Sequence, residues 1–313
     1  IRPGMIVHNA FSYHLTPGGF ILDEGARALG CTVFPGGVGN TELQVAAIQQ
    51  IRPEVYVGTP DYLRTLLDHA ADGQPLDSIR LALVSGGALF PAMREGYREA
   101  GVGVLQCYAT ADAGVIAFET ATEDGTAHAG MVLSEGLIVE LCRPGSGEPV
   151  DPGERGEVVV TLLDPVGEAP LAPLVRFATG DLSAVLEGEC PDGRTNTRLA
   201  GWLGRADQRT KVRGMFVDPV QVQSVRAAHP EIERLRLIVS HRAGRDVMVL
   251  RAQRRAATAA GAAPASVPTD ALLAALGESL RGACGLGGEV ELVDELPADG
   301  IVVEDLRDYE ESA

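Results

Sequence analysis

The sequence predicts an α/β fold: a large N-terminal α/β domain that includes a β-rich subdomain, and a small α+β C-terminal domain. Short apolar strands alternate with helical segments in the first part of the chain, and strands bounded by Pro and Gly turns follow from Gly136. A second α+β pattern begins after Asp207. The length of 313 residues fits two domains, which we place at 1–206 and 207–313.

The first part of the chain is expected to alternate between helices and strands. Residues 18–30 have the apolar spacing of a helix that ends at a glycine, and residues 41–50 predict a second helix with Thr41 as its candidate cap. A third helix is expected to start at 59–61. Buried strands are expected at 31–35, 55–58, 81–85 and 102–108. This alternation predicts a mainly parallel sheet whose functional loops follow the carboxyl ends of the strands.

Strands and tight turns dominate the middle of the chain. Strands are expected at 136–141, 156–161 and 182–186. The smaller C-terminal domain is expected to hold strands at 235–240 and 247–250, an Ala- and Pro-rich loop at 256–268 and a capped amphipathic helix at 269–281.

The charge balance argues against nucleic-acid and membrane partners. The chain has 43 acidic and 26 basic residues, a net charge of −17, whereas nucleic acids and anionic membranes attract basic surfaces. No apolar run approaches the roughly 20 residues that span a bilayer, and no signal-peptide pattern opens the chain. Five scattered cysteines without a CxxC pattern predict neither a disulfide framework nor a zinc site. We therefore expect a cytoplasmic protein.

Four glycine-flanked strings are candidates for chemistry: VGTPDYL (57–63), SGGALFP (85–91), FATGD (177–181) and GRADQRTKVRGMFVDP (204–219). Gly86 and Gly87 allow a flat ring to lie against the backbone, although a tight turn uses the same residues. Asp181, expected just after a strand, could accept both hydroxyls of a ribose or simply close a turn. Residues 204–214 suit a linker or an exposed charged loop, and they include Lys211, the only lysine of the chain.

In this order and at these spacings, the strings resemble the phenylacetate–CoA ligase family of adenylate-forming enzymes. The resemblance runs from about Asn9 to Tyr309. The strings FSYHLTPGG and GWLGRADQRTKVRGMFVDP look closest to the branch that includes 2-hydroxyisobutyryl-CoA ligase. The resemblance implies that ATP and Mg²⁺ activate a small carboxylic acid as an acyl-adenylate. A small mobile C-terminal domain then rotates, and the thiol of CoA displaces AMP. Family members are often homodimers.

The resemblance also implies a nucleotide site. Gly86, Gly87 and Ala88 would line the adenine, and Tyr108 would stack on it, although Tyr108 could equally be a core aromatic. Asp181 would hold the ribose hydroxyls, and Arg205 would reach the ribose or a phosphate.

Further positions match the catalytic and hinge positions of the family. Asp112 falls where the family has a Glu that binds Mg²⁺, with a helix cap as the alternative. Thr110 is the candidate for a phosphate contact, because Ala109 and Ala111 flank it where many relatives have Gly and Ser or Thr. Asp207 falls on the hinge. The remaining positions are Lys211 and Gly214 on the loop used in the second step, and Tyr13, His14, Gly58, Thr59 and Pro60 beside the acyl pocket, where His14 could also simply pack.

Two departures from the family pattern bear on activity. The family's Ser/Thr/Gly-rich phosphate loop does not occur in this sequence, so we expect roughly a hundred residues upstream of Ile1. Ile301 stands where the family has a lysine that contacts the carboxylate and the α-phosphate. Losing a charge-assisted contact of about 1.5–3 kcal/mol should slow adenylation by at least about 10- to 100-fold.

Three hypotheses follow. The first is an AMP-forming acid–CoA ligase. The second is a non-catalytic or impaired nucleotide-binding homologue, favoured by Ile301. The third keeps adenylation but uses an unusual oxyacid such as nitrite, or an amine acceptor. Some relatives carry a Cys/His cluster that could hold zinc, but Asp192 and Thr120 occupy two of its positions here, so no zinc is expected.

Overall fold

The computed structural model describes residues 1–71, 75–163, 174–242, 245–255 and 268–307. The chain divides into two compact units, Ile1–Ala206 and Asp207–Asp308. No helix in the described part of the chain is long and apolar enough to cross a membrane.

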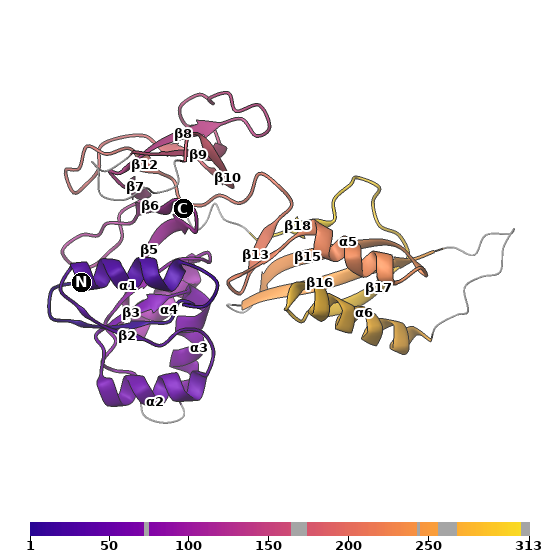
Figure 1. Cartoon of the computed structure of the whole chain (residues 1–313), viewed down its shortest axis with the longest axis horizontal. Helices are drawn as coiled ribbons and strands as arrows, with labels where there is room; N and C mark the ends of the chain where they lie inside the picture. Colours follow the sequence, from indigo (N-terminus) through magenta and orange to yellow (C-terminus); the bar gives the residue numbers. More distant parts are fainter. Residues whose placement is uncertain (72–74, 164–173, 243–244, 256–267, 308–313) are drawn as a thin grey trace, which may run out of the picture. The chain divides into compact units, whose positions relative to one another are not determined.

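One half of the large sheet in unit 1 is parallel, in the order β2-β1-β3-β4-β5. Its strands are β1 (Ile6–Asn9), β2 (Thr32–Pro35), β3 (Val55–Gly58), β4 (Leu81–Val84) and β5 (Gly103–Thr110). The connecting helices are α1 (Gly18–Ala28), α2 (Thr41–Ile51), α3 (Pro60–Ala71) and α4 (Pro91–Glu99) (Figure 1). Strand β1 lies between β2 and β3. The chain runs from β1 to β2 on one side and then crosses to β3 on the other side, so the direction of the strand order reverses at β1. Ligands of open α/β sheets bind at the carboxyl ends of strands beside such a reversal.

Helices cover both faces of this parallel half. Leu22 and Ala26 of α1 pack against Val7, Val55 and Val57 on one face. On the other face, residues of α2, α3 and α4 pack against the sheet: Ile48, Leu63, Leu66, Met93 and Tyr97 meet Tyr56, Ala82, Val84 and Val104. Strands buried on both faces read as the continuous apolar runs that the sequence shows.

The other half of the same sheet is antiparallel, in the order β5-β6-β7-β12-β11. It adds β6 (Gly114–Phe118), β7 (Met131–Leu133), β11 (Val185–Leu186) and β12 (Arg198–Leu199). A separate antiparallel sheet contains β8 (Leu137–Cys142), β9 (Gly156–Leu162) and β10 (Phe177–Ser183). One apolar cluster joins the two sheets, with Tyr108, Ile116, Leu199 and Val158 among its members.

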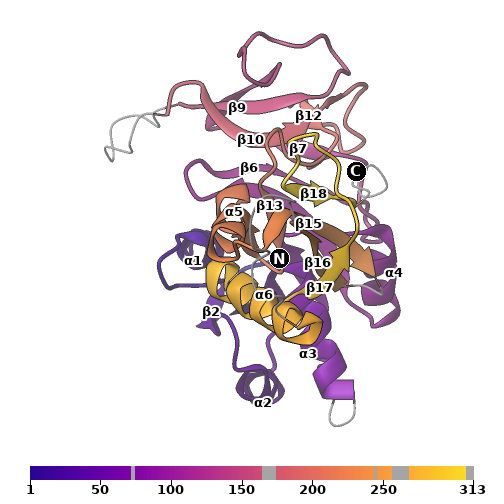
Figure 2. The ribbon, with the colours of Figure 1, turned by 90° about the vertical axis from the view of Figure 1, so that its right-hand side faces the viewer.

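Unit 2 is a four-stranded sheet with two helices on one face, preceded by a hairpin (Figure 1, Figure 2). Its hairpin strands are β13 (Thr210–Val212) and β14 (Met215–Val217), and its helices are α5 (Pro219–Ala228) and α6 (Thr269–Cys284). The sheet has the order β17-β16-β15-β18, with β15 (Ile232–Arg242), β16 (Arg245–Arg254), β17 (Glu289–Val293) and β18 (Val303–Asp305). Val222, Val225, Leu272, Leu276 and Leu280 fill the space between the helices and the sheet.

The predicted fold class is confirmed, and several local predictions were wrong. The cap of α2 is Asn40 in a left-handed conformation, not Thr41. The helix α6 has no side-chain cap, because Pro268 is its N-cap residue, and it continues to Cys284, beyond the expected end. The strand expected at 182–186 is divided between β10 and β11. Most of the Ala- and Pro-rich loop (256–267) lies outside the described residues.

Candidate functional site

Asp181 lies inside strand β10, at a β-bulge. The sequence placed it after a strand, which was wrong: the pairing of β10 with β9 shifts register between Ala178 and Leu182. Gly180 makes this bulge possible, because its φ of +75° is a conformation that other residues adopt only under strain. Its N–H donates to Glu157 Oε1 at 3.0 Å. A bulge re-aims a side chain, and here it directs Asp181 toward β5.

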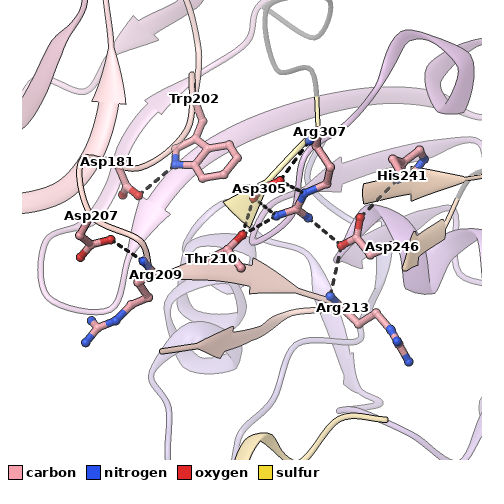
Figure 3. A network of polar contacts seen from close by, with 10 residues as sticks. All are labelled: Asp181, Trp202, Asp207, Arg209, Thr210, Arg213, His241, Asp246, Asp305 and Arg307. Carbon is pink, nitrogen blue, oxygen red and sulfur yellow. Dashed lines mark hydrogen bonds and ion pairs between the residues drawn. The ribbon is translucent and has the colours of Figure 1, made fainter. Parts of the chain in front are cut away.

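Three side-chain donors converge on the Asp181 carboxylate. The Tyr108 hydroxyl donates to Oδ2 at 2.8 Å, while Trp202 Nε1 and Arg205 Nη1 each donate to Oδ1 at 2.9 Å (Figure 3 shows the contact between Trp202 and Asp181). The side chains of Asp181 and Arg205 are only 11% and 9% exposed. We call Tyr108, Asp181, Trp202 and Arg205 the carboxylate cluster. Its ion pair is largely removed from water, so each partner depends on the other.

The electrostatics of this cluster hold Tyr108 as a donor. Burial raises the pKa of the Tyr108 phenol, and the negative charge of Asp181 raises that pKa further. The phenol therefore keeps its proton at physiological pH. Thr179 Oγ1 lies 3.3 Å from the same hydroxyl and offers it a second acceptor.

The glycine-rich turn lies at the same sheet edge as Tyr108. Gly86, Gly87 and Ala88 follow β4, and Tyr108 lies just beyond the last pairing of β4 with β5, at Val84 and Gln106. Gly86 has a φ of +74°, and Gln106 Nε2 donates to the Gly87 carbonyl at 3.0 Å. The turn is thus anchored to β5, and its residues have no side chain or only a methyl group.

Thr110 and Asp112 lie at the turn between β5 and β6. Thr110 Oγ1 accepts the N–H of Ala113 at 3.0 Å, and Asp112 is exposed. The alternative interpretation of Asp112 as a helix cap was wrong, because this turn joins two antiparallel strands. No group of three or more potential metal-ligating side chains occurs among the described residues.

The predicted pocket residues lie at or just beyond the carboxyl ends of β1 and β3, the two strands at the reversal of the sheet. Tyr13 donates to Asp23 Oδ2 at 2.7 Å, and burial together with Asp23 raises the pKa of its phenol. His14 is exposed. A Cβ on Gly58 would collide with the hydroxyl of Tyr56, so only glycine fits there.

The neighbouring turn carbonyls are held by tyrosine hydroxyls. Tyr56 donates to the carbonyl of Thr59 at 3.0 Å, and Tyr97 donates to the carbonyl of Pro60 at 2.7 Å. This turn is therefore rigidly supported from the core.

In unit 2, Lys211 lies on β13 opposite Phe216, with its Nζ 5.2 Å from the centre of the ring. Arg213 and Gly214 form the two-residue turn of the hairpin with positive φ values of 49° and 82°, as a type I′ turn requires. The expected linker thus ends where β13 begins. Asp207 Oδ1 accepts the N–H of Arg209 at 3.0 Å.

A buried network around Arg307 was not predicted (Figure 3). Its guanidinium donates to Asp246 Oδ2 at 2.8 Å, to Asp305 Oδ2 at 2.6 Å and to Thr210 Oγ1 at 2.7 Å. Asp246 also accepts the N–H of Arg213 at 3.4 Å. The network therefore fixes both ends of the segment that carries Lys211.

Ile301 lies on a loop that Gln208 holds in place. Gln208 Oε1 accepts the N–H of Val302 at 2.7 Å, and its Nε2 donates to the Gly300 carbonyl at 3.1 Å. Ile301 is 38% exposed. The loop thus presents an apolar side chain at position 301.

Known proteins are similar to this chain in sequence and in structure. A family model described as "AMP-binding enzyme" matches residues 25–161, which include the Gly58–Pro60 turn, the Gly86–Ala88 turn and Tyr108. The phenylacetate-coenzyme A ligase of Thermus thermophilus is 36% identical over 248 residues, 78% of this chain and 54% of that protein. The chain contains a region that matches the AMP-binding enzymes, and it is a homologue of the phenylacetate–coenzyme A ligases.

Other relatives support the same relationship. The phenylacetate-coenzyme A ligase of Aromatoleum evansii is 32% identical over 237 residues, 74% of this chain and 52% of that protein. A crystal structure of 2-hydroxyisobutyryl-CoA ligase with 2-HIB-AMP and CoA superposes with a TM-score of 0.79 and 26% identity, covering 98% of this chain and 66% of that one. The chain spans about half the length of the curated relatives it matches.

Proposed function

We propose that the protein acts in an AMP-forming acid–CoA ligase reaction. A carboxylate oxygen of a small acid attacks the α-phosphorus of ATP, and pyrophosphate leaves with its bonding electrons. The CoA thiol then loses its proton and attacks the acyl carbon, and AMP leaves. The observation that carries this proposal is the carboxylate cluster, taken together with the AMP-binding match over residues 25–161.

Each residue of the proposed nucleotide site would contact a different part of the nucleotide. Gly86, Gly87 and Ala88 would accept the adenine ring beside Tyr108, and Asp181 would accept hydrogen bonds from the ribose. Arg205, which is paired with Asp181, would reach the ribose or a phosphate. An in-line displacement at phosphorus is catalysed mainly by such positioning and by cations that stabilise developing charge.

Asp112 fits a magnesium ion that the substrate brings with it. Its carboxyl is exposed at the turn that also holds Thr110, and Mg²⁺ commonly uses one or two carboxylates together with substrate phosphates. When bound, the ion would stabilise charge on the phosphates. Asp112 would hold it, and Thr110 would contact a phosphate.

The acid and CoA would use other parts of the chain. Tyr13, His14 and the Gly58–Pro60 turn would border the acyl pocket at the sheet reversal. In unit 2, Asp207 would serve as the hinge, and Lys211 and Gly214 on the hairpin would act in the CoA step. All five cysteines are free, which supports a cytoplasmic location.

A second candidate function is adenylate binding with impaired adenylation. The exposed apolar side chain of Ile301 favours it, because the loop is held in place but offers no charge to the phosphate. The two functions differ in whether pyrophosphate is released.

Acid-dependent pyrophosphate release tests the choice between them. The protein and its Ile301→Lys variant are assayed with ATP, Mg²⁺ and a panel of small acids, with and without CoA. We expect the lysine to raise release by at least about 10- to 100-fold, as a charge-assisted contact of about 1.5–3 kcal/mol implies. AMP binding without release in either form would support the impaired homologue, and release that ignores the acid would refute the ligase proposal.

A further inference from the structure

We propose that Trp202 is a positioning residue of the nucleotide site, whose indole N–H fixes the Asp181 carboxylate for the ribose hydroxyls. This inference rests on the proposed function, because it requires a nucleotide at the carboxylate cluster. The observation that carries it is the hydrogen bond of 2.9 Å from Trp202 Nε1 to Asp181 Oδ1 (Figure 3).

The backbone around Trp202 is tied to the same strand as Asp181. The Leu203 N–H donates to the Leu182 carbonyl at 2.8 Å, and the Leu182 N–H donates to the Gly204 carbonyl at 2.9 Å. On the other side, Ser183 Oγ donates to the Gly201 carbonyl at 2.6 Å. The indole itself packs against the apolar cluster that joins the two sheets. Trp202 and Asp181 are therefore held in register with each other.

The number of acceptor sites on the carboxylate shows why one fixed donor matters. An ionised carboxylate offers about four lone-pair sites. In the described structure, Tyr108, Trp202 and Arg205 use three of them. A ribose that donates from both hydroxyls needs two sites, so at least one of the present donors must turn away when the nucleotide binds.

Trp202 is the donor least able to turn away. The Tyr108 hydroxyl can rotate toward Thr179 Oγ1, which lies 3.3 Å from it. The guanidinium of Arg205 ends a flexible side chain. The Trp202 ring, in contrast, is rigid and packed, and the backbone on both sides is bonded to β10. Trp202 thus keeps Oδ1 occupied and leaves Oδ2 directed toward the ligand.

The test replaces the indole N–H and leaves the ring in place. Trp202 is the only tryptophan of the chain, so metabolic incorporation of β-(benzothien-3-yl)alanine changes this one position. Titration calorimetry then measures Kd for AMP and for 2′,3′-dideoxy-AMP with the intact protein, the analogue protein and Trp202→Phe. Asp181→Asn serves as the reference for loss of ribose recognition.

The measured quantity is the preference for AMP over the dideoxy nucleotide. We expect the analogue and Trp202→Phe to lower this preference about tenfold, equivalent to about 1.4 kcal/mol, with the affinity for 2′,3′-dideoxy-AMP unchanged. If Trp202 only packs, the variants would weaken the binding of both nucleotides equally or would change neither affinity. Thermal unfolding of each protein confirms that the fold is retained.

Two contrary results are distinguishable. If Asp181→Asn lowers the preference but the benzothienyl protein keeps it, Trp202 only packs and the inference is overturned while the proposed site stands. If Asp181→Asn also leaves the preference unchanged, the ribose role of Asp181 in the proposed function fails, and the role of Trp202 fails with it.

Discussion

The Arg307 network should carry a large share of the stability of unit 2. The Arg307 side chain is 3% exposed, and that of its partner Asp246 is 7% exposed. Arg307→Met keeps a long unbranched side chain but removes the Arg307 charge from the carboxylates of Asp246 and Asp305. Removing one partner of a buried ion pair costs about 3–5 kcal/mol, so we expect that loss in the free energy of unfolding of unit 2.

Two spectroscopic probes separate the units in a denaturant titration. Trp202 fluorescence reports on unit 1, whereas far-UV circular dichroism reports on both units. We expect Arg307→Met to unfold early by circular dichroism without an equal shift in fluorescence. The double variant Arg307→Met with Asp246→Asn should recover at least about 1 kcal/mol, because it removes one uncompensated charge.

A matched control is available on the surface of the four-stranded sheet of unit 2. Arg251 pairs with Glu291 at 3.2 Å, and both side chains are about half exposed, at 45% and 49%. Such pairs contribute about 0–1 kcal/mol, so Arg251→Met should have little effect. An Arg307→Met transition no earlier than that of Arg251→Met would refute the reasoning.

Two further predictions concern unit 1, with Trp202 fluorescence as the probe. Gly180→Ala should cost more than Gly145→Ala. Both glycines have positive φ, which costs other residues about 1–2 kcal/mol, but only a Cβ at 180 would push the Arg205 guanidinium away from Asp181. Equal losses in the free energy of unfolding would contradict this. Burial lowers the pKa of His8 in the folded protein below 6.5, its value in the unfolded chain. The folded state therefore keeps its full stability above pH 6.5 and loses stability as the pH falls from there through the folded pKa, by up to about 1.4 kcal/mol per pH unit. The stability of His8→Gln should therefore depend less on pH, and superimposable pH profiles would refute this.

The sequence predicts elements well where the governing interactions are local. The strands of the parallel half are short apolar runs buried on both faces, and α1 ends close to the glycine that the pattern indicated. Caps were predicted less well: Thr41 is a good cap residue by type, but the chain turns at Asn40 through its left-handed conformation. The cap depends on the backbone that precedes the helix, which residue type alone does not fix.

The site shows the same limit more strongly. The resemblance placed Tyr108, Asp181 and Arg205 in one site, and the structure joins them by hydrogen bonds although 73 residues separate the first two. Trp202 was missed because its contact with Asp181 depends on the bulge at Gly180 and on the register that follows it. Arg307 was missed because its acceptors come from three separate segments.

Calorimetric titration with AMP tests the central claim, that the carboxylate cluster binds a nucleotide. The intact protein is compared with Asp181→Asn and with Asp151→Asn, a change at an exposed position. We expect micromolar AMP binding that weakens by roughly 10- to 100-fold in Asp181→Asn, as loss of a charge-assisted contact implies, and that persists in Asp151→Asn. Equal affinity in the intact protein and Asp181→Asn would contradict the claim.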